Sequence, residues 1–147
     1  MQQRLSVSEN VPEAYKLMLE MEKFIATTDI DIKLRELIKI RCSQINHCAY
    51  CLDMHIKDAL KEGVSAQKIN LVAAWNESII FTEAERAALA FAEEVTNISD
   101  YGVSDDVYFE LKNHFTQKQI AQLIIIINQI NSWNRIAVSS LQPHPID

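Results

Sequence analysis

The scarcity of glycine and proline is the feature that most limits the folds open to this chain. Only two glycines and three prolines occur among its 147 residues, whereas an all-β sandwich of many short strands needs turn residues at every reversal. A chain of this length buries roughly 70% of the surface that its unfolded form exposes, so a core can form without disulfides or metals. We therefore expect an all-α fold. Since no linker or repeat interrupts the sequence, we expect a single domain over residues 1–147.

Charge and hydropathy argue against two classes of partner. The formal net charge is −6, and the basic residues are scattered rather than grouped in a stripe, so we expect no nucleic-acid partner. The longest strongly apolar run, Leu123 to Ile127, is far too short to cross a bilayer, and the N-terminus lacks an apolar signal core. We therefore expect a cytoplasmic protein with no membrane partner.

Capping residues and apolar spacing predict about six to seven helices. The first begins at Val11 or Pro12 and ends near Asp29, and its apolar residues lie on one face: Ala14, Leu17, Met18, Met21 and Phe24. We expect Met18 and Met21 to pack in the core. The helices expected after it are 32–45, 47 or 48–62 ended by Gly63, 66–75 capped by Ser65, 83–99 capped by Thr82 with Glu85, 105–114 capped by Ser104, and a last long helix capped by Thr116 that contains Ile120 to Ile136. Residues 123–127 lie inside that last helix, where we expect burial on nearly all sides, and the tail 142–147 should be irregular.

The stretch from Cys48 to His55 carries the most chemical information. Cys48 and Cys51 form a C-x-x-C pair, and His55 follows four residues after Cys51. At roughly 100° per residue, a helix projects all three side chains from one face. Cys51 and His55 are an i,i+4 pair and can touch.

Thiol redox chemistry suits this arrangement. A helix N-terminus and a nearby imidazole both favour the thiolate, which is the nucleophilic form of cysteine. Two cysteines at this spacing can close a reversible disulfide, in which one sulfur is oxidised and the other resolves it. The odd number of cysteines, three in all, fits a reducing compartment. No βαβ pattern is present, so a thioredoxin fold is not expected.

Other interpretations of the motif remain open. Cys48, Cys51, His55 and either His47 or Cys42 could supply four zinc ligands, although a C-x-x-C pair on one continuous helix is poorly placed for tetrahedral closure. The same residues could also be ordinary buried groups. Cys42 has nothing near it in sequence that would activate it.

Residues outside the motif receive simpler interpretations. Glu36 lies between two leucines, where it is either a solvated residue at the rim or a carboxylate with a specific partner. We assign no chemistry to the remaining aromatic and imidazole side chains, which are expected in the core, at an interface or on the surface: Trp75, Trp133, His114 and His144.

The spacing of the motif resembles that of the alkylhydroperoxidase D and carboxymuconolactone decarboxylase superfamily, in its thiol-active branch. That branch has a glutamate, eleven intervening residues, C-x-x-C, three residues and a histidine, and Glu36, Cys48, Cys51 and His55 match all four positions. The resemblance is clearest over about residues 30–90. It implies a helical bundle that forms homo-oligomers, commonly trimers or hexamers, with the site near subunit contacts.

The resemblance also implies an activity. The chain would be a thiol-dependent peroxidase that reduces hydroperoxides through the Cys48–Cys51 pair, with Glu36 and His55 as a proton relay. Cys51 would react with the peroxide and Cys48 would resolve it, with no cofactor or metal and with an external thiol donor of unknown identity. Family members often have a histidine between the cysteines, where this chain has Tyr50. The alternatives are a redox-sensing or zinc-binding helical protein, or an enzyme like the decarboxylase branch, which lacks the cysteine pair.

Overall fold

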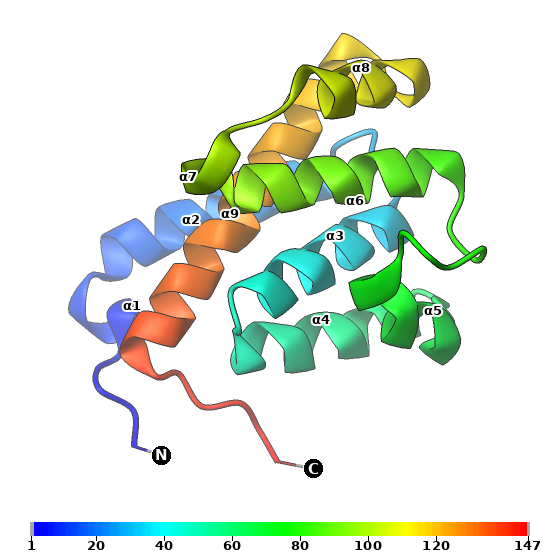
Figure 1. Ribbon diagram of the computed structural model, residues 1–147. Helices are drawn as coiled ribbons and strands as arrows, with labels where there is room; N and C mark the ends of the chain where they lie inside the picture. The colour runs from blue at the N-terminus through cyan, green and yellow to red at the C-terminus, as the bar shows by residue number, and fades with distance from the viewer. Residues whose placement is uncertain (1, 147) are drawn as a thin grey trace.

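The computed structural model describes residues 2–146, and the regular secondary structure within them is entirely helical, as expected (Figure 1). Within this part of the chain, seven helices have six or more residues and two have four, with one short 3-10 turn after the fifth. Their bounds are α1 (Val7–Asn10), α2 (Pro12–Ala26), α3 (Ile32–Ile45), α4 (Ala49–Lys61), α5 (Ala66–Leu71), η1 (Val72–Ala74), α6 (Glu83–Thr96), α7 (Ile98–Tyr101), α8 (Asp105–His114) and α9 (Gln117–Ser140).

Local signals set most of these boundaries. The hydroxyl side chains predicted as N-caps all accept a backbone N–H three residues further on: Ser65, Thr82, Ser104 and Thr116. Gly63 follows α4 with a φ of +80°, a conformation that glycine adopts without strain and that ends the helix. The two four-residue helices, α1 and α7, were not predicted because an element of one turn is too short to show an apolar period.

Helix α3 lies at the centre of the bundle, with α4, α6 and α9 packed around it (Figure 1). One apolar cluster joins α3 to α6 and α9, and a second joins α3 to α4, α5 and α6. Because the same helix contributes to both clusters, its side chains are buried almost all round, and Leu37, Ile38 and Ile40 are at most 1% exposed. The central helix therefore fixes the positions of its neighbours.

The apolar run in α9 is buried much as predicted. Leu123, Ile126 and Ile127 are fully buried, although Ile124 is 37% exposed. Helix α9 has 24 residues, but none of the described helices is both long enough and apolar enough to cross a membrane. Its length instead allows it to pass several other helices in turn.

The core prediction for the first helix is wrong. Leu17 is 72% exposed, Phe24 51% and Met21 38%, and within α2 only Ile25 is buried. The spacing predicted the helix correctly, but an apolar period does not show whether the same chain covers the apolar face.

A buried amide network joins α9 to the end of α3, just before the cysteine motif. The Asn46 side-chain amide donates to the side-chain oxygens of Asn131 and Asn134, at 2.9 Å in each case. Asn134 is fully buried, and its own amide donates to the hydroxyl of Ser43 at 2.9 Å. These bonds hold the chain that leads into Cys48 against α9.

We expect Asn134→Leu to lower the free energy of unfolding by about 2 kcal/mol, because it removes the hydrogen bonds that Asn134 makes with Asn46 and with the buried hydroxyl of Ser43. Urea denaturation of the two proteins measures the difference. Asn128→Leu, at an exposed position of the same helix, is the matched control and should change the stability by less than about 0.5 kcal/mol. Equal effects of the two substitutions would show that the network does not stabilise the fold.

Candidate active site

The first turn of α4 carries both cysteines of the motif. Cys48 is the N-cap of the helix, and its sulfur accepts the backbone N–H of Cys51 at 3.3 Å. The residue before it, His47, has a φ of 53° in the left-handed region, which turns the chain from α3 into α4. The predicted helix start was thus correct to within one or two residues. Cys48 lies where the helix dipole favours negative charge.

Cys48 and Cys51 are joined as a disulfide, with their Cα atoms 5.4 Å apart. This separation is in the usual range for a bridged pair. Each cysteine is only 1% exposed, so a reagent reaches the sulfurs only through a pocket. The sequence prediction that these two thiols lie close enough to form a reversible bridge agrees with this geometry.

Glu36 and His55 form a buried hydrogen bond between α3 and α4. The Glu36 Oε2 and His55 Nδ1 atoms are 2.8 Å apart, and the two residues are 7% and 6% exposed. The carboxylate of Glu36 can only accept, so Nδ1 carries the hydrogen. In the neutral imidazole, Nε2 is then the nitrogen that can take up a proton. Residue spacing alone left the partner of Glu36 undecided, and the family resemblance implied His55, which is the residue that lies against it in the structure.

A lysine completes the environment of Glu36. Burial opposes ionisation of the Glu36 carboxyl, but the hydrogen bond from His55 and the charge of Lys39 outweigh burial and lower its pKa below the ordinary value. Lys39 Nζ lies 3.4 Å from Glu36 Oε1 and 3.6 Å from Glu22 Oε2. The carboxylate thus remains charged and keeps the imidazole oriented.

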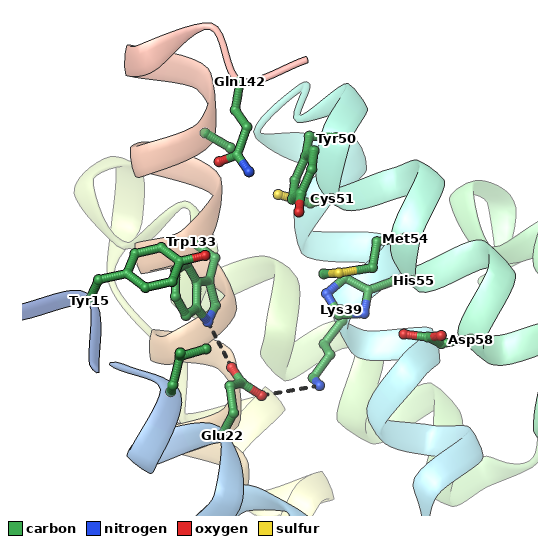
Figure 2. Close-up of a pocket in the computed structure, with 12 residues that line it drawn as sticks. Tyr15, Glu22, Lys39, Tyr50, Cys51, Met54, His55, Asp58, Trp133 and Gln142 are labelled. Atoms are coloured by element: carbon green, nitrogen blue, oxygen red, sulfur yellow. Dashed lines mark hydrogen bonds and ion pairs between the residues drawn. The ribbon is translucent and has the colours of Figure 1, made fainter. Parts of the chain in front are cut away.

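A pocket of about 270 Å³ opens beside Cys51 and His55. Figure 2 shows Tyr15 and Trp133 facing these two residues across the pocket. The ring centroids of Tyr15 and Trp133 are 5.1 Å apart, and Trp133 Nε1 donates to Glu22 Oε1 at 2.8 Å. Side chains from α2, α3, α4 and α9 therefore enclose the space next to the reactive groups.

Sequence reasoning missed several residues of this pocket. It placed Trp133 in the core or at an interface, and it assigned no role to Tyr15, Glu22 or Lys39. Trp133 packs against the core cluster, as predicted, and also forms part of the pocket wall. No local signal could have identified these residues, because Trp133 and Glu22 are 111 positions apart in the chain.

The third cysteine lies apart from the pair. Cys42 is fully buried and accepts a hydrogen bond from the Thr96 hydroxyl at 3.2 Å. Burial raises the pKa of its thiol to about 12, so little of it is thiolate near neutral pH. Two histidines also lie outside the site: His114 pairs with Glu110 at 2.9 Å, and His144 is in the exposed tail.

The candidate zinc ligands are not gathered around one point. Among the described residues, Glu36, His55 and Asp58 place ligand atoms within 4.8 Å of one another, and this group includes neither Cys48 nor Cys51. In the disulfide the two sulfurs are bonded to each other and offer no thiolate to a metal.

Comparison with known proteins places the chain in a family. The sequence profile of the carboxymuconolactone decarboxylase family matches residues 12–94. The chain belongs to this family. It is 45% identical over 139 residues, 95% of either chain, to the uncharacterized protein YdfG of Bacillus subtilis (strain 168).

Solved structures of related proteins share the whole fold. A protein of unknown function from Agrobacterium tumefaciens, whose name links it to AhpD antioxidant defence, has a TM-score of 0.97 at 38% identity, covering 99% of this chain and 100% of that one. The debrominase Bmp8 has a TM-score of 0.83 at 24% identity, covering 93% and 74%. The resemblance to the alkylhydroperoxidase D and carboxymuconolactone decarboxylase superfamily is therefore confirmed.

We expect Lys39→Met to lower the free energy of unfolding by about 1 kcal/mol near neutral pH, because it removes a cation that stabilises the buried carboxylate of Glu36. A lowered folded-state pKa contributes stability above the ordinary carboxyl pKa, and this stability is lost as pH falls through the folded value. The difference between variant and wild type should therefore shrink in acid.

Urea denaturation at a series of pH values measures this effect. Lys23→Met is the matched control, because Lys23 is 72% exposed and pairs with Glu20 on the surface. If Lys39→Met lowers the free energy of unfolding by the same amount at neutral and at acid pH, the electrostatic role of Lys39 is contradicted.

Proposed function

We propose that this protein is a thiol-dependent peroxidase that reduces organic hydroperoxides through Cys48 and Cys51. The observation that carries the proposal is the position of the cysteine pair. Cys51 lines a pocket together with His55, and the buried carboxylate of Glu36 orients His55 from behind. A thiol, a base and a group that orients the base are the parts that an activated nucleophile requires.

In the proposed cycle, His55 takes the proton of the Cys51 thiol, and the thiolate attacks the terminal oxygen of the hydroperoxide. The O–O bond breaks, Cys51 becomes a sulfenic acid, and the proton passes to the departing alcohol oxygen. The Cys48 sulfur then attacks the Cys51 sulfur, the proton of the Cys48 thiol passes to the departing hydroxyl, water leaves, and the disulfide forms. Two equivalents of an external thiol restore the dithiol, so no metal or organic cofactor takes part.

The lining of the pocket supports an organic substrate. Tyr15, Trp133 and Met54 present two aromatic rings and a thioether beside Cys51, and such side chains bind apolar groups rather than the small polar hydrogen peroxide. We therefore propose that cumene hydroperoxide is reduced more efficiently than hydrogen peroxide.

We expect Cys48→Ser and Cys51→Ser each to abolish turnover of cumene hydroperoxide with dithiothreitol, because the cycle needs both sulfurs. Consumption of the peroxide with time measures this. Cys42→Ala is the matched control and should keep most of the activity. An active Cys51→Ser variant would disprove the mechanism. Absence of turnover in the wild type, with reversible disulfide formation intact, would favour a redox sensor.

We expect Glu36→Gln to slow turnover by about 100-fold without unfolding the protein, because a neutral amide supports the charged imidazole of His55 less well. Circular dichroism verifies the fold, and stopped-flow oxidation of the reduced protein measures the step. A rate within about twofold of the wild type would remove Glu36 from the relay.

Thiol-dependent dehalogenation is the second candidate function. The aromatic lining of the pocket fits a flat ring, and one structural neighbour is a debrominase, a variant of which was solved in complex with 2,3,4-tribromopyrrole. A dithiol supplies the two electrons needed to replace a ring halogen by hydrogen, releasing halide and forming the disulfide. Bromide release from a bromopyrrole, in the absence of peroxide, tests this activity.

We also propose that the protein forms a homo-oligomer, a trimer or a hexamer. The apolar residues Leu17, Met21 and Phe24 on α2 are exposed in the single chain, and contact with other copies would remove them from water. Sedimentation equilibrium gives the number of subunits, and a monomer would contradict the proposal.

A further inference from the structure

The disulfide lies between two separate pockets. Cys51 lines the pocket described above, whereas Cys48 lines a second one of about 480 Å³, between the start of α4 and the C-terminal end of α9 with its tail. Neither pocket contains both cysteines. Each cysteine is only 1% exposed, and each lines a different pocket.

Three residues form the partition between the pockets. Tyr50, Ala137 and Gln142 line both. Figure 2 shows Tyr50 and Gln142 on opposite sides of the space next to Cys51, at one end of the first pocket. A reagent bound in one pocket is therefore separated from a reagent bound in the other.

In disulfide exchange, the separation of the pockets determines which sulfur an entering thiol attacks. A thiolate attacks one sulfur along the line of the S–S bond, from the side away from the leaving sulfur, so the sulfur it reaches is decided by access. A thiol in the second pocket can attack Cys48. Cys51 is then the leaving group, and His55 lies in the first pocket with it, where the released thiolate needs a proton.

The charged and polar groups that line the two pockets also favour different ligands. The first is lined by the carboxylates of Glu22 and Asp58 and by the ammonium group of Lys39, which is already paired with Glu22 and Glu36, so its charged groups disfavour an anion. Among its described lining residues the second has no carboxylate, but it has the imidazoles of His47 and His144, and the first turn of α4 starts there. Imidazoles and a helix N-terminus both favour an anionic ligand.

We propose that the second pocket is the binding site for the reductant, a small anionic thiol that attacks Cys48, while the oxidant uses the first pocket at Cys51. The proposal rests on the proposed thiol function. The entering thiol releases its proton to water, its thiolate forms a bond to the Cys48 sulfur, and the Cys48–Cys51 bond breaks. Cys51 leaves with the electron pair and takes a proton that His55 Nε2 has picked up from water. A second thiolate attacks the external sulfur of this mixed disulfide, giving the external disulfide and the Cys48 thiolate.

A matched pair of variants tests the two routes. Val138 lines only the second pocket and is 42% exposed, and Leu19 lines only the first and is 44% exposed. We expect Val138→Trp to slow reduction of the oxidised protein by glutathione by about tenfold and to leave oxidation by cumene hydroperoxide within about twofold. Leu19→Trp should show the reverse pattern. Equal slowing of both half-reactions by either variant, or slower glutathione reduction in Leu19→Trp alone, would overturn the proposal.

The site of attack is tested directly by trapping. Oxidised protein is mixed with glutathione, quenched with N-ethylmaleimide after milliseconds, and digested for mass spectrometry. We expect glutathione on Cys48 and the maleimide on Cys51, and the opposite labelling would overturn the proposal. This experiment requires only the disulfide, so its result stands even if no hydroperoxide is turned over.

A separate measurement tests whether the second pocket prefers an anionic thiol. 3-Mercaptopropionate and cysteamine, at equal thiolate concentrations, are compared as reductants of the oxidised protein and of the uncharged bis(2-hydroxyethyl) disulfide in free solution. We expect the ratio of their rates to favour mercaptopropionate more strongly with the protein. An unchanged ratio, or one that favours cysteamine, would show that the second pocket does not select an anion.

Discussion

The candidate site depends on the buried hydrogen bond between Glu36 and His55. A carboxylate at 7% exposure is costly to ionise unless charge and hydrogen bonds compensate. His55 and Lys39 supply that compensation from two directions, at 2.8 and 3.4 Å. Because Glu36 is on α3 and His55 on α4, the same bond that orients the imidazole also joins the two helices behind the cysteines.

Helix α9 positions the residues that surround the disulfide. Its inner face holds the end of α3 through Asn131 and Asn134, and Trp133 beside them forms a wall of the first pocket. Ala137, one turn later, lines both pockets. A single rigid element thus fixes the start of α4 and divides the space around it, so that access to Cys48 and to Cys51 is controlled separately.

The predictions that succeeded concern features fixed within a few residues. Thr82 and Thr116 begin helices because their hydroxyls accept a nearby N–H, and Gly63 ends one because it adopts a positive φ. Cys51 and His55 share a pocket because one helical turn separates them. The failures concern faces whose partners lie far away in sequence. The apolar face of α2 remains exposed on the single chain, and the contribution of Trp133 to the pocket wall was not predicted.

The sequence by itself determined the helical class, most helix boundaries and the thiol motif, because capping, turn conformation and side-chain periodicity act within one or two turns of the chain. Only the tertiary structure decided that Lys39 lies beside the Glu36–His55 pair, and that the disulfide separates two pockets. Those outcomes depend on which helices pack together. The Trp133–Glu22 bond, between residues 111 positions apart, exists because α2 and α9 pack against each other after folding, and no local pattern records that arrangement.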